Sequence, residues 1–259
     1  MLRGIPNKNF REIIDSIRSW HDGEIILSTW NEIEIDESLV DQVVRTTDPG
    51  TVINFSNPSS HPARSLIHAH RQVLAAHNGI CASNGEKILL TRADIIHRKN
   101  LFQFVEERKD KQVFNKLFEN KVVCGNMMTF DPDTKYGASR DRYYRVCDWF
   151  QCGYRHDILK FVDIENEIEK YKNSGCCLEQ LWFISALNKH TSHTIDPFSI
   201  EEGNSTVLES WKTLLTNFKV IDTRSTAMAD NLRWLHQPEY FDCYITEEKY
   251  NKKMLEMGY

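Results

Sequence analysis

The chain has 259 residues, of which 41% are hydrophobic, 11% aromatic and 27% charged. This is the composition of a soluble globular protein, and the length allows one large α/β domain or a domain with an appended subdomain. The formal net charge is −5 and no long basic run is present, which argues against nucleic acid as a partner.

The cysteines and the hydropathy pattern both indicate a cellular compartment. Seven cysteines are scattered along the chain, an odd number that favours free thiols in a reducing environment over a disulfide framework. No apolar run approaches the roughly 20 residues that a membrane helix needs, and MLRGIPNKNF has no apolar core of signal-peptide length. We therefore expect a cytoplasmic protein, for which peripheral association with a membrane stays open.

Residues 1–130 alternate between strand and helix patterns. Phe10, Ile13, Ile17 and Trp20 recur at helical spacing, and such alternation predicts parallel strands in a three-layer sandwich. Residues 1–5 are only the stub of a first strand, which is either short or weakly paired at a sheet edge. The predicted elements are a helix at 10–20, strands at 24–30 and 42–47, a helix from 66 to the predicted breaker Gly79, a strand at 88–90, a helix at about 100–116 and a strand at 121–130.

The pattern changes from residue 131 onward. Residues 131–157 are rich in aromatic side chains, glycine and charge without a clean period, which is typical of a binding loop rather than of disorder. No internal repeat or linker is present, so we expect one domain over residues 1–259. The remaining predicted elements are helices at 157–173, 178–188 and 205–217, a strand at 218–221 and a terminal helix from about 246.

The segment at 66–94 carries the strongest functional signal. Ligands of open α/β sheets collect at the carboxyl ends of the strands. Thr91, Arg92 and Asp94 follow the strand at 88–90, so we expect them at the site of chemistry.

Five short pieces of the chain occur together in a recognisable order: EIILSTW at 24–30, HRQ at 70–72, LLTRAD at 89–94, CDWFQCG at 147–153 and EQLW at 179–182. In these pieces the chain resembles the WavE family of lipopolysaccharide-synthesis proteins. This resemblance implies a nucleotide-sugar-dependent glycosyltransferase of the A-type, Rossmann-like fold, with a donor-binding half at 1–130 and an acceptor-binding half at 131–259. Its implied role is to add a sugar to a surface glycan, such as lipopolysaccharide or capsule. The chain departs from the family in its clipped first strand and in the charged Arg3 before Gly4.

The resemblance implies a site for a divalent metal on the donor diphosphate. A-type enzymes commonly hold Mn or Mg with an Asp-x-Asp motif, because these ions prefer oxygen ligands. Here the same place reads Arg92-Ala93-Asp94, with one carboxylate. Asp94 either binds the metal or caps the next turn, and Arg92 either meets phosphate or pairs with Asp94. His97 and His236 are candidates for an additional ligand.

Further donor contacts are expected from the preceding elements. Arg64, His68 and Arg71 share one helix face, which suits a diphosphate but is equally compatible with a solvated surface. Trp30 and Thr29 end the second strand and could contact the nucleoside, or Trp30 could be a core residue. Gly4 would allow close approach of the nucleotide to the backbone, or simply form a turn.

Two acids are candidates for the acceptor side. Asp148 lies beside Trp149 in the aromatic segment, a recurrent combination for holding a sugar, and Glu179 lies near the start of the predicted helix at 178–188. Either could deprotonate the acceptor hydroxyl, and either could instead cap a turn or helix. The alternative function is a non-catalytic protein that binds a nucleotide sugar or carbohydrate through a degenerate active site.

Overall fold

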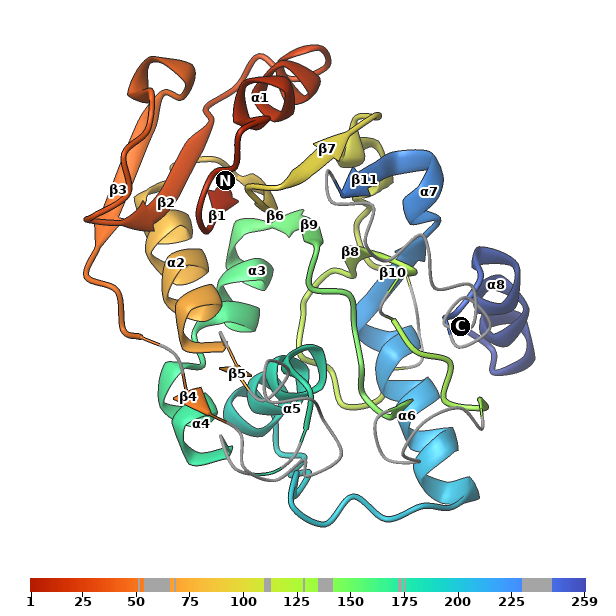
Figure 1. The fold of residues 1–259 in the computed structure, drawn as a ribbon. Helices are drawn as coiled ribbons and strands as arrows, with labels where there is room; N and C mark the ends of the chain where they lie inside the picture. Colours follow the sequence, from red (N-terminus) through yellow and green to blue (C-terminus); the bar gives the residue numbers. More distant parts are fainter. Residues whose placement is uncertain are drawn as a thin grey trace.

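Seven strands form one central sheet in the computed structural model, in the order β10-β8-β9-β6-β1-β2-β3 (Figure 1). The structure describes residues 1–50, 52–53, 66–67, 69–109, 113–127, 129–134, 142–171, 174, 176–229 and 244–259. The strands of the sheet are β1 (Leu2–Arg3), β2 (Ile26–Trp30), β3 (Gln42–Thr46), β6 (Lys87–Arg92), β8 (Val122–Gly125), β9 (Phe150–Tyr154) and β10 (Phe218–Ile221).

Neighbouring strands run parallel, except that β9 is antiparallel to both β6 and β8. The predicted fold class, a Rossmann-like three-layer sandwich with a mostly parallel central sheet, is therefore confirmed. Four further strands form two antiparallel pairs outside this sheet. These pairs are β4 (Val52–Ile53) with β5 (Leu66–Ile67), and β7 (Ile95–His97) with β11 (Ala227–Ala229).

The first strand is short but central. β1 contains only Leu2 and Arg3, and Leu2 lies opposite both Leu27 of β2 and Thr91 of β6. The amide of Ala93 donates to the Arg3 carbonyl at 3.0 Å, which continues the ladder past the end of β6. The expectation of a short strand is confirmed, and the alternative of weak pairing at an edge is wrong.

The two residues of β1 point to opposite faces, as adjacent residues of a strand must. Leu2 packs with Ile13 of α1 in one apolar cluster. Arg3 points the other way, toward Gln72 of α2 and the ring of Trp182 in α5. Helices therefore cover both faces of the sheet at this point. The helices are α1 (Phe10–Arg18), α2 (Ala69–Ala82), α3 (Arg155–Val162), α4 (Glu165–Tyr171), α5 (Leu178–His190), α6 (Asn204–Asn217), α7 (Thr223–Thr226) and α8 (Glu247–Glu256).

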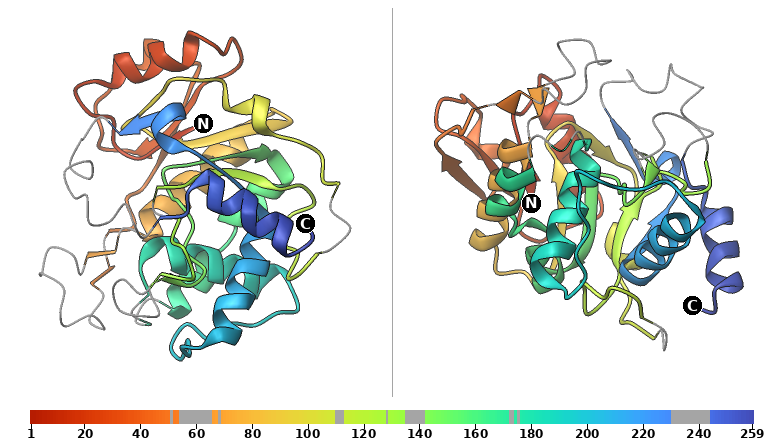
Figure 2. Two further views of the ribbon diagram at one scale, coloured as in Figure 1. Left: turned by 90° about the vertical axis from the view of Figure 1, so that its right-hand side faces the viewer. Right: turned by 90° about the horizontal axis from the view of Figure 1, so that it is seen from below.

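The C-terminal elements close the other end of the sheet. Helices α6 and α8 lie beside β10, at the opposite side of the molecule from β2 and β3 (Figures 1 and 2). Helix α8 begins where the sequence predicts, with the Thr246 hydroxyl accepting from the Lys249 amide at 3.1 Å. None of the helices in the described part of the chain is long and apolar enough to cross a membrane. Six cysteines lie in that part, and all six are free thiols.

Helix α2 differs from its predicted bounds at both ends. Leu66 and Ile67 belong to β5, and the helix runs from Ala69 through the predicted breaker Gly79 to Ala82. A Cβ atom at position 79 would come within 2.7 Å of the Met1 sulfur. The glycine therefore allows the side chain of Met1 to pack against the helix, and it does not end the helix.

The helix predicted at about 100–116 is wrong for the described residues. A short 3-10 turn covers Leu101–Phe104, and the chain that follows is irregular. Arg108 organises this segment without helical bonds. Its amide donates to the Asn120 side chain at 3.0 Å, and its Nε donates to the Glu119 carbonyl at 2.9 Å. Hydrogen bonds to a later loop have replaced the helical pattern.

The aromatic segment at 131–157 contains a strand that the sequence pattern did not reveal. β9 has the sequence FQCGY, in which Gln151 and Gly153 interrupt the apolar run, yet its first four residues are buried. The helix predicted at 157–173 is two helices, α3 and α4, which break at residues 163–164. The end of this segment thus lies in the core.

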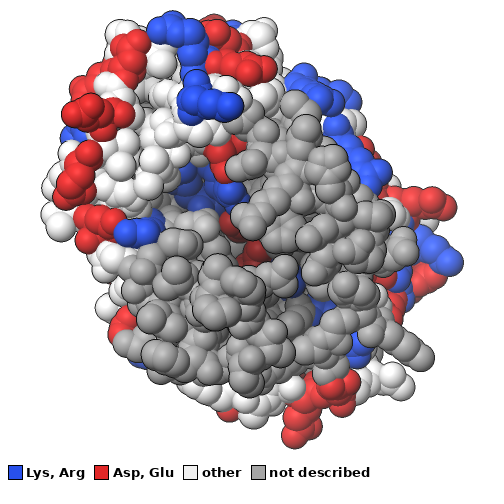
Figure 3. All heavy atoms as spheres, viewed as in Figure 1, with Lys and Arg blue, Asp and Glu red and all other residues white. Residues whose placement is uncertain are grey.

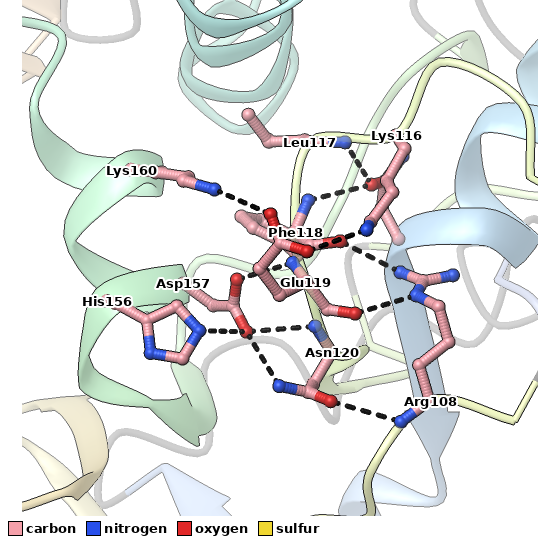
Figure 4. A network of polar contacts seen from close by, with 10 residues as sticks. Arg108, Lys116, Leu117, Phe118, Glu119, Asn120, His156, Asp157 and Lys160 are labelled. Atoms are coloured by element: carbon pink, nitrogen blue, oxygen red, sulfur yellow. Dashed lines mark hydrogen bonds and ion pairs between the residues drawn. The ribbon is translucent and has the colours of Figure 1, made fainter.

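A buried carboxylate anchors the loop before β8 (Figure 4). Asp157 of α3 is fully buried, and it accepts from the amides of Glu119 at 2.6 Å and Asn120 at 3.0 Å. His156 is 3.3 Å from the same carboxylate but is mostly exposed. The position of β8 therefore depends on one acid in α3.

We expect Asp157→Ala to lower the free energy of unfolding by about 3 kcal/mol, because it removes a fully buried carboxylate and leaves two partly buried amides without an acceptor. Urea unfolding monitored by circular dichroism measures this loss. The control is His156→Ala, which should change the free energy by less than about 0.5 kcal/mol since the side chain is exposed. Equal losses in the two variants would contradict the anchoring role of Asp157.

Candidate functional site

A pocket lies where the strand order reverses, beside β1. From β1 the chain proceeds outward to β2 and β3 on one side, while β6 lies on the other side. Such a switch point leaves a crevice at the carboxyl ends of the strands. Here the crevice has a volume of about 390 Å³. It is lined by Arg3, Gly4, Ile5, Trp30, Arg71, Gln72, Arg92, Ala93 and Asp94.

Five of the residues predicted to bind the donor therefore line one pocket: Gly4, Trp30, Arg71, Arg92 and Asp94. Lys and Arg atoms gather in a hollow near the centre of the face drawn in Figure 3, with Asp and Glu atoms beside them. The pocket wall thus carries more positive than negative side chains.

Gly4 gives the chain its turn out of β1. Its φ is +101°, a conformation that L side chains rarely adopt, and its amide donates to the Ser28 carbonyl at 3.1 Å. A Cβ atom at this position would meet nothing within 4 Å. The requirement for glycine here is therefore the backbone conformation rather than space.

Arg92 and Asp94 form a two-pronged ion pair at the end of β6. Arg92 Nε donates to one carboxylate oxygen of Asp94 at 2.9 Å, and a terminal nitrogen donates to the other at 2.6 Å. Asp148 lies on the far side of Arg92, 3.8 Å from its other terminal nitrogen. The two carboxylates together outweigh burial and raise the pKa of Arg92, so the guanidinium stays charged.

Asp148 reaches this place because β9 is antiparallel. The carboxyl end of β6 meets the start of β9, where Thr91 lies opposite Phe150 and the Arg92 amide donates to the Trp149 carbonyl at 3.2 Å. The Asp148 side chain is only 5% exposed. Burial raises the pKa of Asp148, against the opposing effect of the Arg92 charge.

Arg3 is a largely buried cation in the pocket wall. Its guanidinium donates to the Gln72 side chain and to the Asp148 carbonyl, and it lies 4.8 Å from the centre of the Trp182 ring. Burial lowers the pKa of Arg3 to about 10, while the nearby Asp148 carboxylate opposes the shift. Arg3 therefore remains a cation at neutral pH.

Arg71 lines the pocket from α2 and is also ion-paired. Its Nε donates to Asp48 at 2.7 Å, and a terminal nitrogen donates to the second oxygen of the same carboxylate. Asp48 also accepts from the Gly50 amide at 2.9 Å. The hydrogen bond to Asp48 favours the charged form of Arg71 and so raises the pKa of Arg71. Arg64 and His68, predicted to share its helix face, lie outside the described residues.

The two acceptor-side acids are buried next to the pocket rather than on its wall. Glu179 is in the first turn of α5 and lies 3.7 Å from Arg145, with 11% of its side chain exposed. Its charge is close enough to Asp148 to raise the pKa of that carboxyl. The roles of Asp148 and Glu179 in binding or deprotonating an acceptor stay predictions.

The remaining candidates lie at different places. Trp30 lines the pocket but is only 3% exposed, and the Thr29 side chain is buried away from it. The Thr29 hydroxyl has no hydrogen-bond partner among the described residues. His97 is buried in β7, and its Nε2 shares a 2.8 Å hydrogen bond with Thr91. His236 lies outside the described residues.

The described side chains do not form a site suited to a divalent metal. No group of three His, Cys, Asp or Glu residues that could hold an ion occurs in the part of the chain that the structure describes. Among the pocket-lining residues Asp94 has the only carboxylate, and both of its oxygens accept from Arg92. The metal at Asp94 stays a prediction from the sequence motif.

Sequence reasoning missed four residues of the pocket lining, of which two, Arg3 and Gln72, have polar side chains. Arg3 counted only as a departure from the family pattern, and Gln72 only as part of the HRQ motif. A charged residue inside an otherwise apolar strand stub was the available signal, because a buried charge persists where it has partners or a role. Gln72 carried no comparable signal of its own.

The family model of WavE lipopolysaccharide synthesis matches residues 3–237. The chain belongs to this family. Among solved structures, the chain is similar to a crystal structure of an active-site mutant of LgtC, with 12% sequence identity and a TM-score of 0.43. That match covers 72% of this chain and 69% of the LgtC chain. A search of curated proteins found no match.

The buried His97 gives this WavE-family protein a pH-dependent stability. Burial, helped by the N-terminal ammonium group, lowers the pKa of His97 from 6.5 to about 3. Between these values the unfolded chain takes up a proton that the folded chain does not. The free energy of unfolding should therefore fall as the pH drops from 6.5 toward 3, by up to about 1.4 kcal/mol per pH unit from this group.

Urea unfolding at several pH values tests this expectation. His97→Gln can keep a hydrogen bond to Thr91 but cannot take up a proton, so its unfolding free energy should depend less steeply on pH in this range. An unchanged slope in the variant would contradict the assignment to His97. His156→Gln, at an exposed position, is the control and should leave the slope unchanged.

Proposed function

We propose that the protein is a glycosyltransferase that moves a sugar from a nucleotide-sugar donor to lipopolysaccharide or a related surface glycan. The observation that carries this proposal is the pocket at the switch point, whose wall holds three arginines and one carboxylate. Family membership supports the lipopolysaccharide context. All the described residues that line the pocket fall within 1–130, in keeping with a donor-binding first half and an acceptor-binding second half.

The chemistry of glycosyl transfer fits this distribution of charge. A diphosphate leaving group accumulates negative charge as the bond to the sugar breaks, and fixed positive groups stabilise that charge. Arg71 and Arg92 lie on the pocket wall, where they can meet phosphate oxygens. The Asp94 carboxylate, on the same wall, can accept hydrogen bonds from the donor sugar. Gly4 lets the nucleotide approach the end of β1.

The acceptor hydroxyl must lose its proton during transfer. Asp148 and Glu179 are the proposed candidates for that role. Asp148 also lies 3.8 Å from Arg92, so holding that guanidinium in place is an alternative role for its carboxylate. These two roles differ in which kinetic constant they change.

Transfer should depend on Asp94. With purified lipopolysaccharide and a panel of UDP-, GDP- and CDP-sugars, release of nucleoside diphosphate measures turnover. We expect Asp94→Asn to reduce turnover by about 100-fold, because the uncharged amide orients the sugar and Arg92 poorly. The control is Asp36→Asn, which removes an exposed carboxylate paired with Arg11 at 3.1 Å and should leave turnover unchanged. Full activity in Asp94→Asn would remove Asp94 from the site.

Asp148→Asn separates catalysis from positioning. If Asp148 deprotonates the acceptor, kcat falls while the affinity for nucleoside diphosphate is unchanged. If it mainly positions Arg92, the affinity falls as well. We expect the first pattern, and the second would leave Glu179 as the candidate base.

The rival function is binding of a nucleotide sugar without transfer. The burial of both candidate bases favours it, because neither acid lines the pocket. Donor binding without transfer or hydrolysis on any glycan offered would support this rival over the enzyme.

A further inference from the structure

The cations of the pocket come from three different elements. Arg3 belongs to β1, Arg71 to α2 and Arg92 to β6, and all three line the same crevice. Of the three carboxylates that face these arginines, Asp94 lines the pocket, whereas Asp48 and Asp148 are not among the lining residues. The described lining therefore presents three guanidinium groups and one carboxylate to a ligand, and Asp48 and Asp148 partly offset the charge of the arginines that they face.

The carboxylates near the pocket are already bound by guanidinium groups. Asp94 receives two hydrogen bonds from Arg92, and Asp48 receives two from Arg71. Asp148 lies 3.8 Å from Arg92. Divalent cations need several oxygen ligands: Ca²⁺ takes six or more and Mg²⁺ takes six. To bind here it would have to displace these guanidinium groups and remain beside them.

We propose that Arg71 and Arg92 bind the diphosphate of the donor directly, so that donor binding requires no divalent metal. This inference rests on the proposed function and concerns the same pocket. In this inference the two arginines take the place of the divalent metal that the family resemblance implied at Asp94.

The geometry of arginine suits this role. A guanidinium is planar and always charged, and it offers parallel donors that match the oxygens of a phosphate. The side chains of Arg71 and Arg92 are 27% and 32% exposed, so both can be reached from the pocket. Asp48 holds the side chain of Arg71, and Asp94 and Asp148 flank that of Arg92. The arginines are thereby positioned before the ligand arrives, which reduces the entropy lost on binding.

Arg3 acts behind these two residues as a positioning residue. It is only 2% exposed, and its guanidinium is bound by Gln72 and the Asp148 carbonyl. Its charge adds to the positive potential of the pocket. Its bond to the Asp148 backbone also fixes the residue that contacts Arg92.

The test compares nucleoside diphosphates with the corresponding nucleosides. Binding of UDP, GDP, CDP and ADP and of their nucleosides is measured by calorimetry, in EDTA and again with Mn²⁺. We expect at least one diphosphate to bind in EDTA at least about 100-fold more tightly than its nucleoside, from two charge-assisted contacts. Adding Mn²⁺ should change this ratio by less than about threefold.

Charge removal assigns the effect to the two arginines. Arg71→Gln and Arg92→Gln should each weaken diphosphate binding by at least about tenfold and leave nucleoside binding unchanged. The matched control is Arg11→Gln, which removes an exposed arginine paired with Asp36 and should change neither affinity. If a glutamine variant does not fold, salt titration of the native protein decides. Diphosphate affinity in EDTA should then fall with salt while nucleoside affinity does not.

The outcomes separate this inference from the proposed function. Diphosphate binding that is lost in EDTA and restored by Mn²⁺ would overturn the inference and leave the transferase proposal standing. Equal weakening of diphosphate and nucleoside in the arginine variants, or a diphosphate affinity that salt does not change, would also overturn it. No binding of any nucleotide, with or without Mn²⁺, would count against the proposed function itself.

Discussion

The structure depends on the antiparallel insertion of β9 between β6 and β8. This strand pairs with both neighbours, as Leu89 and Val123 each lie opposite Cys152. It therefore joins the first parallel strands to β8 and β10 in one continuous sheet. Because β9 runs in the opposite direction, its first residues lie at the carboxyl ends of the others. That reversal brings Asp148 to Arg92, so the same pairing builds both the sheet and the inner side of the site.

The site is held by paired charges that are largely removed from water. Isolated buried charges are costly, but each cation here has a specific partner: Asp94 for Arg92, Asp48 for Arg71, and Gln72 with the Asp148 carbonyl for Arg3. The pairing explains how three guanidinium groups can share one small crevice before any anion is bound. An anionic ligand would add charge-assisted contacts to guanidinium groups that are already held in place, and such contacts favour anions over neutral ligands of the same size.

Local patterns predicted much of the fold, and long-range contacts account for the rest. Helical spacing predicted α1, and the apolar run at 24–30 predicted β2. In both cases the apolar pattern that indicates the element lies entirely within that element. The packing of Met1 against Gly79 and the hydrogen bonds between Arg108 and residues 119–120 join distant parts of the chain, so no local pattern could reveal them. In the site, the carboxyl-end rule found the LLTRAD segment, but the pocket role of Arg3 required knowing that β1 is central.

The central position of β1 also orders the folding of the chain. Leu2 pairs with Thr91, almost ninety residues further along, and the Arg3 side chain is bound by the carbonyl of Asp148. Contacts between residues so far apart in the sequence form slowly, because the chain loses the entropy of loop closure before the contact stabilises it. During synthesis, at about 5–20 residues per second, the first strand must wait seconds for its neighbours. Helix α1 and strand β2 can form locally in that time, whereas the inner side of the pocket, where the Asp148 carbonyl binds Arg3, is complete only after the start of β9 has been made.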